Sequence, residues 1–140
     1  MKRLFLFIAA IMFALSFTSC DDIIKEARAD WEKTVLKIER EKIPFRINDY
    51  KINGIEVKDI VIDTIVTTYH SDGNIVPCWG YLKTTLTLKK FLGENEYGFL
   101  YDEKYVTKTI LVELENCGYS SGHPQYTTKW PLNPYNIIKQ

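Results

Sequence analysis

Residues 79–90 read WGYLKTTLTLKK, and this stretch decides the fold. Apolar and polar side chains alternate along it. Leu82, Leu86 and Leu88 lie on one side of an extended chain, and lysines and threonines lie on the other. Successive side chains of a β-strand point to opposite faces of its sheet, so this period of two predicts a strand with one buried face and one solvated face.

Two turn sequences join this strand to the segments before it. Asp72-Gly73 separates residues 55–69 from residues 75–90, and Asn53-Gly54 separates residues 45–52 from residues 55–69. Asn-Gly and Asp-Gly supply the positive φ angles that two-residue hairpin turns require. Both joints therefore predict antiparallel hairpins.

The predicted turns also fix a register. Pairing across Asp72-Gly73 sets Val57 opposite Leu88 and Val61 opposite Thr84. Together with the Asn53-Gly54 turn, it predicts one core face made of Tyr50, Ile52, Ile55, Val57, Val61, Ile65, Leu82, Leu86 and Leu88. A longer connection over residues 91–102 leads to a fourth predicted strand over residues 105–115, so the sheet spans about residues 45–116.

A helix is predicted before the sheet, over about residues 22–42. Asp21 and Asp22 suit its start, and Pro44 ends the pattern. The apolar residues recur at helical spacing: Ile24, Ala27, Trp31, Val35 and Ile38. Because the polar face mixes acids with bases, this apolar stripe is expected to face the core and not a membrane.

The predicted fold class is therefore α+β, with an N-terminal helix packed on a four-stranded antiparallel meander sheet. The tail over residues 118–140 contains Pro124, Pro131 and Pro134, which exclude a long helix and favour an irregular aromatic tail. In the order of these elements, the chain resembles cystatin-like and nuclear-transport-factor-like small lipoproteins. Such a likeness of fold does not fix a function.

The N-terminal residues have the pattern of an export signal. Lys2 and Arg3 precede an apolar run over residues 4–17, which is short for a membrane-spanning helix. Phe17-Thr18-Ser19-Cys20 resembles the lipobox of bacterial lipoproteins, whose signal is cut before the cysteine after diacylglycerol joins its thiol. The resemblance implies a signal peptide over residues 1–19, lipidation of Cys20 and a single mature domain over residues 20–140. Phe17 departs from the usual Leu, so an ordinary cleaved signal stays the alternative.

Charge and cysteine content narrow the function classes. The 18 basic and 18 acidic side chains balance, which gives no electrostatic reason to expect nucleic acid as a partner. In an oxidising compartment, Cys78 and Cys117 are a candidate disulfide. Strand parity puts them on opposite faces, so a bridge requires a bulge or a strand end that reorients one of them. Neither cysteine has the spacing of a zinc site.

The sequence shows little that predicts catalysis. His70 and His123 lie in predicted turn or tail segments without a local catalytic signature, and such residues are usually turn residues. Asp59 and Asp63 share a strand face, and Asp63 is the acid to check for a buried partner, although a bulge position explains it better. No phosphate loop or metal cluster is present. We expect no catalytic residue, no metal and no cofactor.

A binding function remains, with Tyr126, Trp130 and Tyr135 as the candidate ligand or partner residues. They could stack on a glycan or anchor a protein, or they could cap the core. The alternative surface is the Thr-Tyr sheet face: Tyr81, Thr85, Thr87, Tyr105, Thr107 and Thr109. We expect a membrane-anchored envelope lipoprotein that binds protein or glycan, or alternatively a periplasmic inhibitor or immunity-type protein that blocks a toxin or hydrolase. Asp21-Asp22 resembles a sorting signal and favours the outer membrane over the inner.

Overall fold

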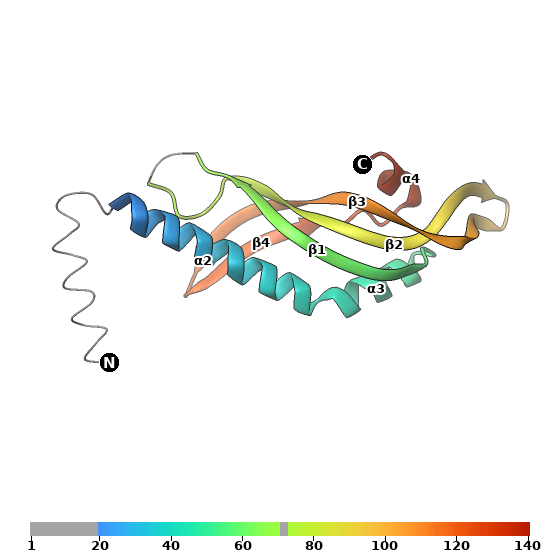
Figure 1. The fold of residues 1–140 in the computed structure, drawn as a ribbon, viewed down its shortest axis with the longest axis horizontal. Helices are drawn as coiled ribbons and strands as arrows, with labels where there is room; N and C mark the ends of the chain where they lie inside the picture. Colours follow the sequence, from blue (N-terminus) through green and yellow to red (C-terminus); the bar gives the residue numbers. More distant parts are fainter. Residues whose placement is uncertain (1–19, 71–72) are drawn as a thin grey trace.

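The computed structural model describes residues 20–70 and 73–140, so the expected signal peptide over residues 1–19 lies outside the described part of the chain. The elements run in the order α2 (Cys20–Glu41), α3 (Ile43–Ile52), β1 (Val57–Thr68), β2 (Trp79–Asn95), β3 (Gly98–Ser120), β4 (His123–Lys129) and α4 (Pro134–Ile138) (Figure 1).

The four strands form one antiparallel sheet in the order β1-β2-β3-β4, which confirms the predicted α+β meander. The helices α2 and α3 run along the same side of this sheet (Figure 1). The core lies between them and includes Trp31, Val35, Tyr50, Ile55, Ile60, Ile62, Leu82, Leu86, Leu88, Ile110, Val112, Leu114, Trp130 and Ile137.

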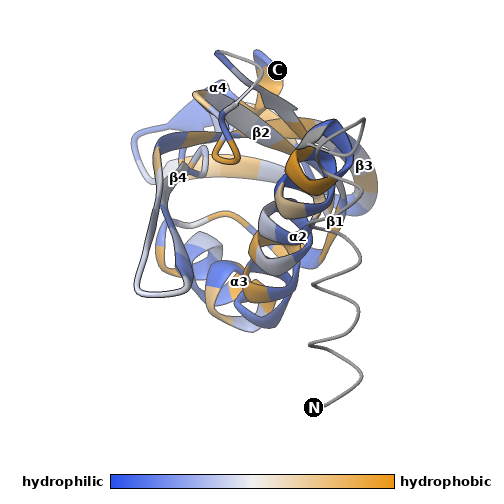
Figure 2. Cartoon of the chain, turned by 90° about the vertical axis from the view of Figure 1, so that its left-hand side faces the viewer, coloured by the Kyte–Doolittle hydropathy of each residue, from blue (hydrophilic) through white to orange (hydrophobic). Residues whose placement is uncertain are grey.

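The predicted helix over residues 22–42 corresponds to α2, which ends at Glu41. Trp31 and Val35 of its apolar stripe are buried, and the Trp31 indole Nε1 donates to the Gly118 carbonyl oxygen at 3.0 Å. The other three stripe residues are half-buried. Figure 2, coloured by hydropathy, shows hydrophobic and hydrophilic residues alternating around α2. The expectation that this stripe faces the core is confirmed for Trp31 and Val35.

The prediction of a strand over residues 45–52 is wrong, because this segment forms helix α3. Pro44 occupies its first turn, where the missing N–H costs no hydrogen bond, so the proline starts a second helix just after ending the first. Gly54 has φ +76°, and the Gly54 and Ile55 amides donate to the carbonyls of Lys51 and Tyr50. Asn53-Gly54 therefore ends a helix and does not form a hairpin turn.

The predicted pairing of β1 with β2 is partly correct. Val57 does lie opposite Leu88, but register shifts between Val57 and Asp59 and between Ile62 and Thr64 displace the rest. Val61 consequently pairs with Thr85 and is 47% exposed. The first bulge inverts the alternation, so that Ile60 and Ile62 take the core positions predicted for Val61.

The C-terminal half is more regular than predicted. The connection expected over residues 91–102 is the end of a long hairpin, in which β2 continues to Asn95 and β3 starts at Gly98. The tail expected to be irregular contains the last residues of β3, the edge strand β4 and helix α4. The sheet therefore has the predicted number of strands but not the predicted set. Residues 45–52, predicted as a strand, belong to helix α3, and β4, which lies in the predicted tail, is the fourth strand.

Candidate functional site

A polar groove of about 690 Å³ lies between the corner of the two long helices and the edge strand β4. Its floor and walls come from α2, from α3 and from residues 124–128, with Asn116 of β3 at one side. Among the strands of residues 20–70 and 73–140, β4 is the last in the sheet, so one side of its backbone has no neighbouring strand there. The groove therefore runs beside an open sheet edge.

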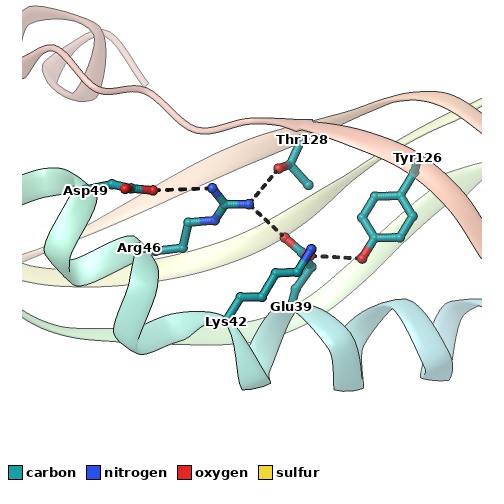
Figure 3. A network of polar contacts seen from close by, with 6 residues as sticks. All are labelled: Glu39, Lys42, Arg46, Asp49, Tyr126 and Thr128. Carbon is teal, nitrogen blue, oxygen red and sulfur yellow. Dashed lines mark hydrogen bonds and ion pairs between the residues drawn. The ribbon is translucent and has the colours of Figure 1, made fainter.

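The helix corner brings together side chains from both helices. α2 ends at Glu41, α3 starts at Ile43, and the Arg46 amide donates to the Lys42 carbonyl at 3.1 Å. Glu39 and Arg46 thereby meet at the floor of the groove (Figure 3).

Glu39 is the centre of the polar network in Figure 3. Its carboxylate is only 1% exposed. Its Oε2 accepts a hydrogen bond from the Tyr126 hydroxyl at 2.9 Å and lies 3.6 Å from the Lys42 ammonium. Its Oε1 lies 3.8 Å from Arg46 Nη2 and has no hydrogen-bond partner among the described residues.

Arg46 links this carboxylate to the opposite wall. Its Nη2 donates to Thr128 Oγ1 at 3.3 Å, and its Nη1 lies 3.5 Å from the Asp49 carboxylate. The guanidinium carbon lies 5.6 Å from the centre of the Trp130 ring, within the range of a cation–π contact. Its buried Nε has no hydrogen-bond partner within the described part of the chain.

The network therefore has an unused acceptor at Glu39 Oε1 and an unused donor at Arg46 Nε. Burying such groups unpaired costs free energy, and a buried carboxylate without its partners costs more than a neutral group does. Burial and the nearby Glu39 carboxylate raise the pKa of Tyr126 well above its ordinary value, so its hydroxyl stays protonated and donates. The site is suited to polar recognition by a ligand with both donors and acceptors.

The three residues predicted for binding take different positions. Tyr126 lines the groove, and its ring meets Trp31 edge-on at 6.2 Å. Trp130 is 9% exposed and packs against Tyr50, which places its ring in the core. Tyr135 is 41% exposed on α4, where its ring contacts Phe91. Tyr126 and Trp130 thus touch the network, whereas Tyr135 belongs to another cluster. Their role in binding stays a prediction.

The two candidate disulfide cysteines are unbonded in this structure. Cys117 packs against the core although strand parity predicted that it would point outward. A register shift between Glu115 and Gly118, with Asn116 at φ +53°, supplies the bulge that a bridge requires. Burial, and after it the charge of Cys78, raises the pKa of the Cys117 thiol. The disulfide stays a prediction.

The remaining polar candidates lie elsewhere. Asp63 falls in the second β1 bulge, is exposed, and accepts from the Thr85 hydroxyl at 2.7 Å. His70 and His123 are exposed. Within residues 20–70 and 73–140, no three His, Cys, Asp or Glu side chains gather to hold a metal ion. No helix in these same segments is long and apolar enough to cross a membrane.

Glu39 was missed by the sequence reasoning, although a signal for it exists. Val35 lies four positions after Trp31, and Glu39 lies four positions after Val35, so all three share one face of the helix. An acid in an apolar stripe indicates a buried partner. Its main contacts, with Tyr126 and Arg46, join distant parts of the chain and follow no local pattern.

Comparison with known proteins found no matching family model, no matching curated protein and no matching solved structure.

Proposed function

We propose that this protein is an envelope lipoprotein, tethered through Cys20, that binds an extended segment of a protein partner in the groove beside β4 and performs no catalysis. The observation that carries this proposal is the position of the groove. It combines a polar floor with an open strand edge. An extended peptide matches both features.

The open edge supports a peptide ligand. An edge strand presents unpaired N–H and C=O groups, and a partner chain can pair with them as an added strand. Pro124 lacks an N–H, so the pairing segment is residues 125–129. A peptide also supplies an amide N–H for Glu39 Oε1 and a carbonyl for Arg46 Nε, the two groups that lack partners.

The aromatic residues of the groove favour protein over glycan. A sugar ring stacks on an exposed aromatic face, but Trp130 is buried and Tyr126 packs its ring against Trp31. A pair of aromatic rings, one exposed and one half-buried, lies instead on the other face of the sheet. There Trp79, which is 48% exposed, stacks on Tyr81 with ring centres 6.2 Å apart. A glycan ligand would be expected at that pair.

The length of α2 would hold the groove away from the bilayer. α2 begins at Cys20 itself, so no spacer separates the proposed anchor from the domain. At about 1.5 Å per residue, Glu39 lies about 28 Å along the helix from Cys20. With Asp21-Asp22 as a sorting signal, we place the protein at the outer membrane, its groove held beyond the lipid headgroups.

The test is co-purification from detergent-solubilised membranes with matched charge reversals. Lys42→Glu places a negative charge at the groove, whereas Lys51→Glu makes the same change on an exposed part of α3. We expect Lys42→Glu to reduce the captured partner at least tenfold and Lys51→Glu to leave it unchanged. Equal capture by both variants would contradict the proposal that the partner binds in the groove. Loss of capture only with Trp79→Ala would indicate instead that a ligand binds at the Trp79–Tyr81 pair.

A further inference from the structure

A second cavity, of about 320 Å³, lies at the other end of the domain. It is bounded by β2, by β3, by helix α4 and by the residue that follows the turn after α3. In Figure 1 this end, with α4 and the β2-β3 hairpin, lies opposite the start of α2. The groove at Glu39 shares none of its lining residues.

The walls of this cavity are apolar, and its polar lining is basic. The apolar side chains include Ile55, Leu88, Val106, Pro134, Ile137 and Ile138. Lys89, Lys90 and Lys108 also line it, and no acidic side chain does. Lys89 is paired with Glu56 at 2.8 Å, and Lys108 donates to the main-chain oxygen of Gln140 at 3.0 Å. Lys90 makes no ion pair or hydrogen bond of this kind among the described residues, so its ammonium can hold the negative end of a ligand whose apolar body fills the cavity.

A hydrogen-bond donor at the cavity supports the same ligand chemistry. Tyr101 lines the cavity, and its buried hydroxyl has no hydrogen-bond partner among the described residues. Burial and the nearby Glu56 raise the pKa of Tyr101, so this hydroxyl keeps its proton.

We propose that this cavity binds the single acyl chain of a free fatty acid, with the carboxylate held by Lys90 at its mouth. The volume sets the chain length. If each methylene takes about the space of one water, about 30 Å³, the cavity holds a chain of about ten carbons. The two long chains of a diacyl phospholipid exceed this volume.

The proposed lipid at Cys20 is not the occupant. α2 holds Cys20 at one end of a helix about 33 Å long, at about 1.5 Å per residue. The cavity is lined by residues of β2, β3 and α4, and in Figure 1 α4 lies toward the end of the domain opposite the start of α2. The proposed ligand is therefore separate from the lipid on Cys20.

Binding is measured by isothermal titration calorimetry on the full chain carrying Cys20→Ala, purified without detergent. The probes are hexanoate, octanoate, decanoate and hexadecanoate, with decyltrimethylammonium as the cationic match for decanoate. Each added methylene should tighten binding roughly fourfold until the cavity is full. Affinity that levels off near decanoate, and that is at least tenfold weaker for the cationic probe, supports the proposal. An affinity that still rises fourfold per carbon up to hexadecanoate overturns it. So does an equal affinity for decanoate and decyltrimethylammonium.

Two exposed substitutions test the location. Ile138→Glu places a negative charge on a lining residue that is 53% exposed, and Lys90→Glu reverses a charge at the mouth. Lys83→Glu is the matched control, because Lys83 is an exposed β2 lysine outside the cavity lining. The first two should weaken decanoate binding at least tenfold with unchanged circular dichroism, and the control should not. Equal effects of Lys90→Glu and Lys83→Glu, or no effect of either cavity substitution, would overturn the assignment.

Discussion

Replacing Tyr126 by Phe tests the network at the floor of the groove. The change removes only the hydroxyl that donates to Glu39 Oε2 at 2.9 Å. Glu39 is 1% exposed, and its other oxygen already lacks a hydrogen bond in the described residues. Without Tyr126, the buried carboxylate keeps only its ion pairs, at 3.6 Å to Lys42 and 3.8 Å to Arg46.

A hydrogen bond to a charged group contributes about 1.5–3 kcal/mol, so Tyr126→Phe should lower the free energy of unfolding by about 2 kcal/mol. For a domain of this size, that corresponds to a fall in Tm of roughly 6–10 °C. Urea and thermal unfolding followed by circular dichroism measure both quantities. Tyr97→Phe is the matched control, because Tyr97 is 89% exposed, and it should change stability by less than about 0.5 kcal/mol.

A double-mutant cycle tests whether the Tyr126 hydroxyl acts through Glu39. Glu39→Gln keeps an acceptor oxygen but removes the charge, so in that background Tyr126→Phe should cost only about 1 kcal/mol. A Tyr126→Phe variant as stable as the control would refute the reasoning. So would an equal cost in both backgrounds, because the hydroxyl would then not be stabilising the Glu39 charge.

The remaining predictions concern the core, the anchor and alkaline pH. Burial raises the pKa of Tyr50 above its unfolded value of about 10. Its contribution to stability is therefore complete below pH about 10 and falls above it by about 1.4 kcal/mol per pH unit. Burial also raises the pKa of Tyr126, so alkaline urea titration should show a steeper total slope, which Tyr50→Phe should reduce by about 1.4 kcal/mol per pH unit without removing it. Gly80→Ala should cost about 1–3 kcal/mol, because its new Cβ would lie 2.7 Å from the Val66 carbonyl oxygen, whereas Gly73→Ala, with nothing within 4 Å, should cost little in the same unfolding assay. Cys20→Ala should abolish incorporation of labelled palmitate and release the protein from membranes; labelling that persists would exclude lipidation at Cys20.

The strongest periodic patterns predicted their elements correctly. The stripe that contains Trp31 and Val35 is a buried helix face, and the alternation around Leu82 and Leu86 is a strand. Both patterns are long enough to distinguish the helical period from the strand period. α3 was mistaken for a strand because its short apolar pattern fits either period, and because Asn53-Gly54 can end a helix as well as turn a hairpin.

Bulges account for most of the errors in side-chain direction. One extra residue inverts the positions that follow it on a strand until a second bulge restores them, as the exposure of Val61 and the inward position of Cys117 show. The marks of these bulges in the sequence are weak: two successive polar residues, Lys58-Asp59, at the first, and Asn116 close to Gly118 at the other. Of the candidate site, only Tyr126 was predicted, because its other residues, such as Arg46 and Thr128, are brought together by tertiary packing and not by spacing in the sequence.

Photocrosslinking in the organism's own envelope tests the central claim, that a protein partner binds beside β4. A benzophenone amino acid replaces Gln125, an exposed residue of the groove wall, or Lys83, an exposed residue on β2 away from the groove. Our account predicts that one discrete protein crosslinks from Gln125, that it does not crosslink from Lys83, and that the crosslink disappears with Lys42→Glu. No crosslink from Gln125, or the same crosslinked proteins from both positions, would contradict it.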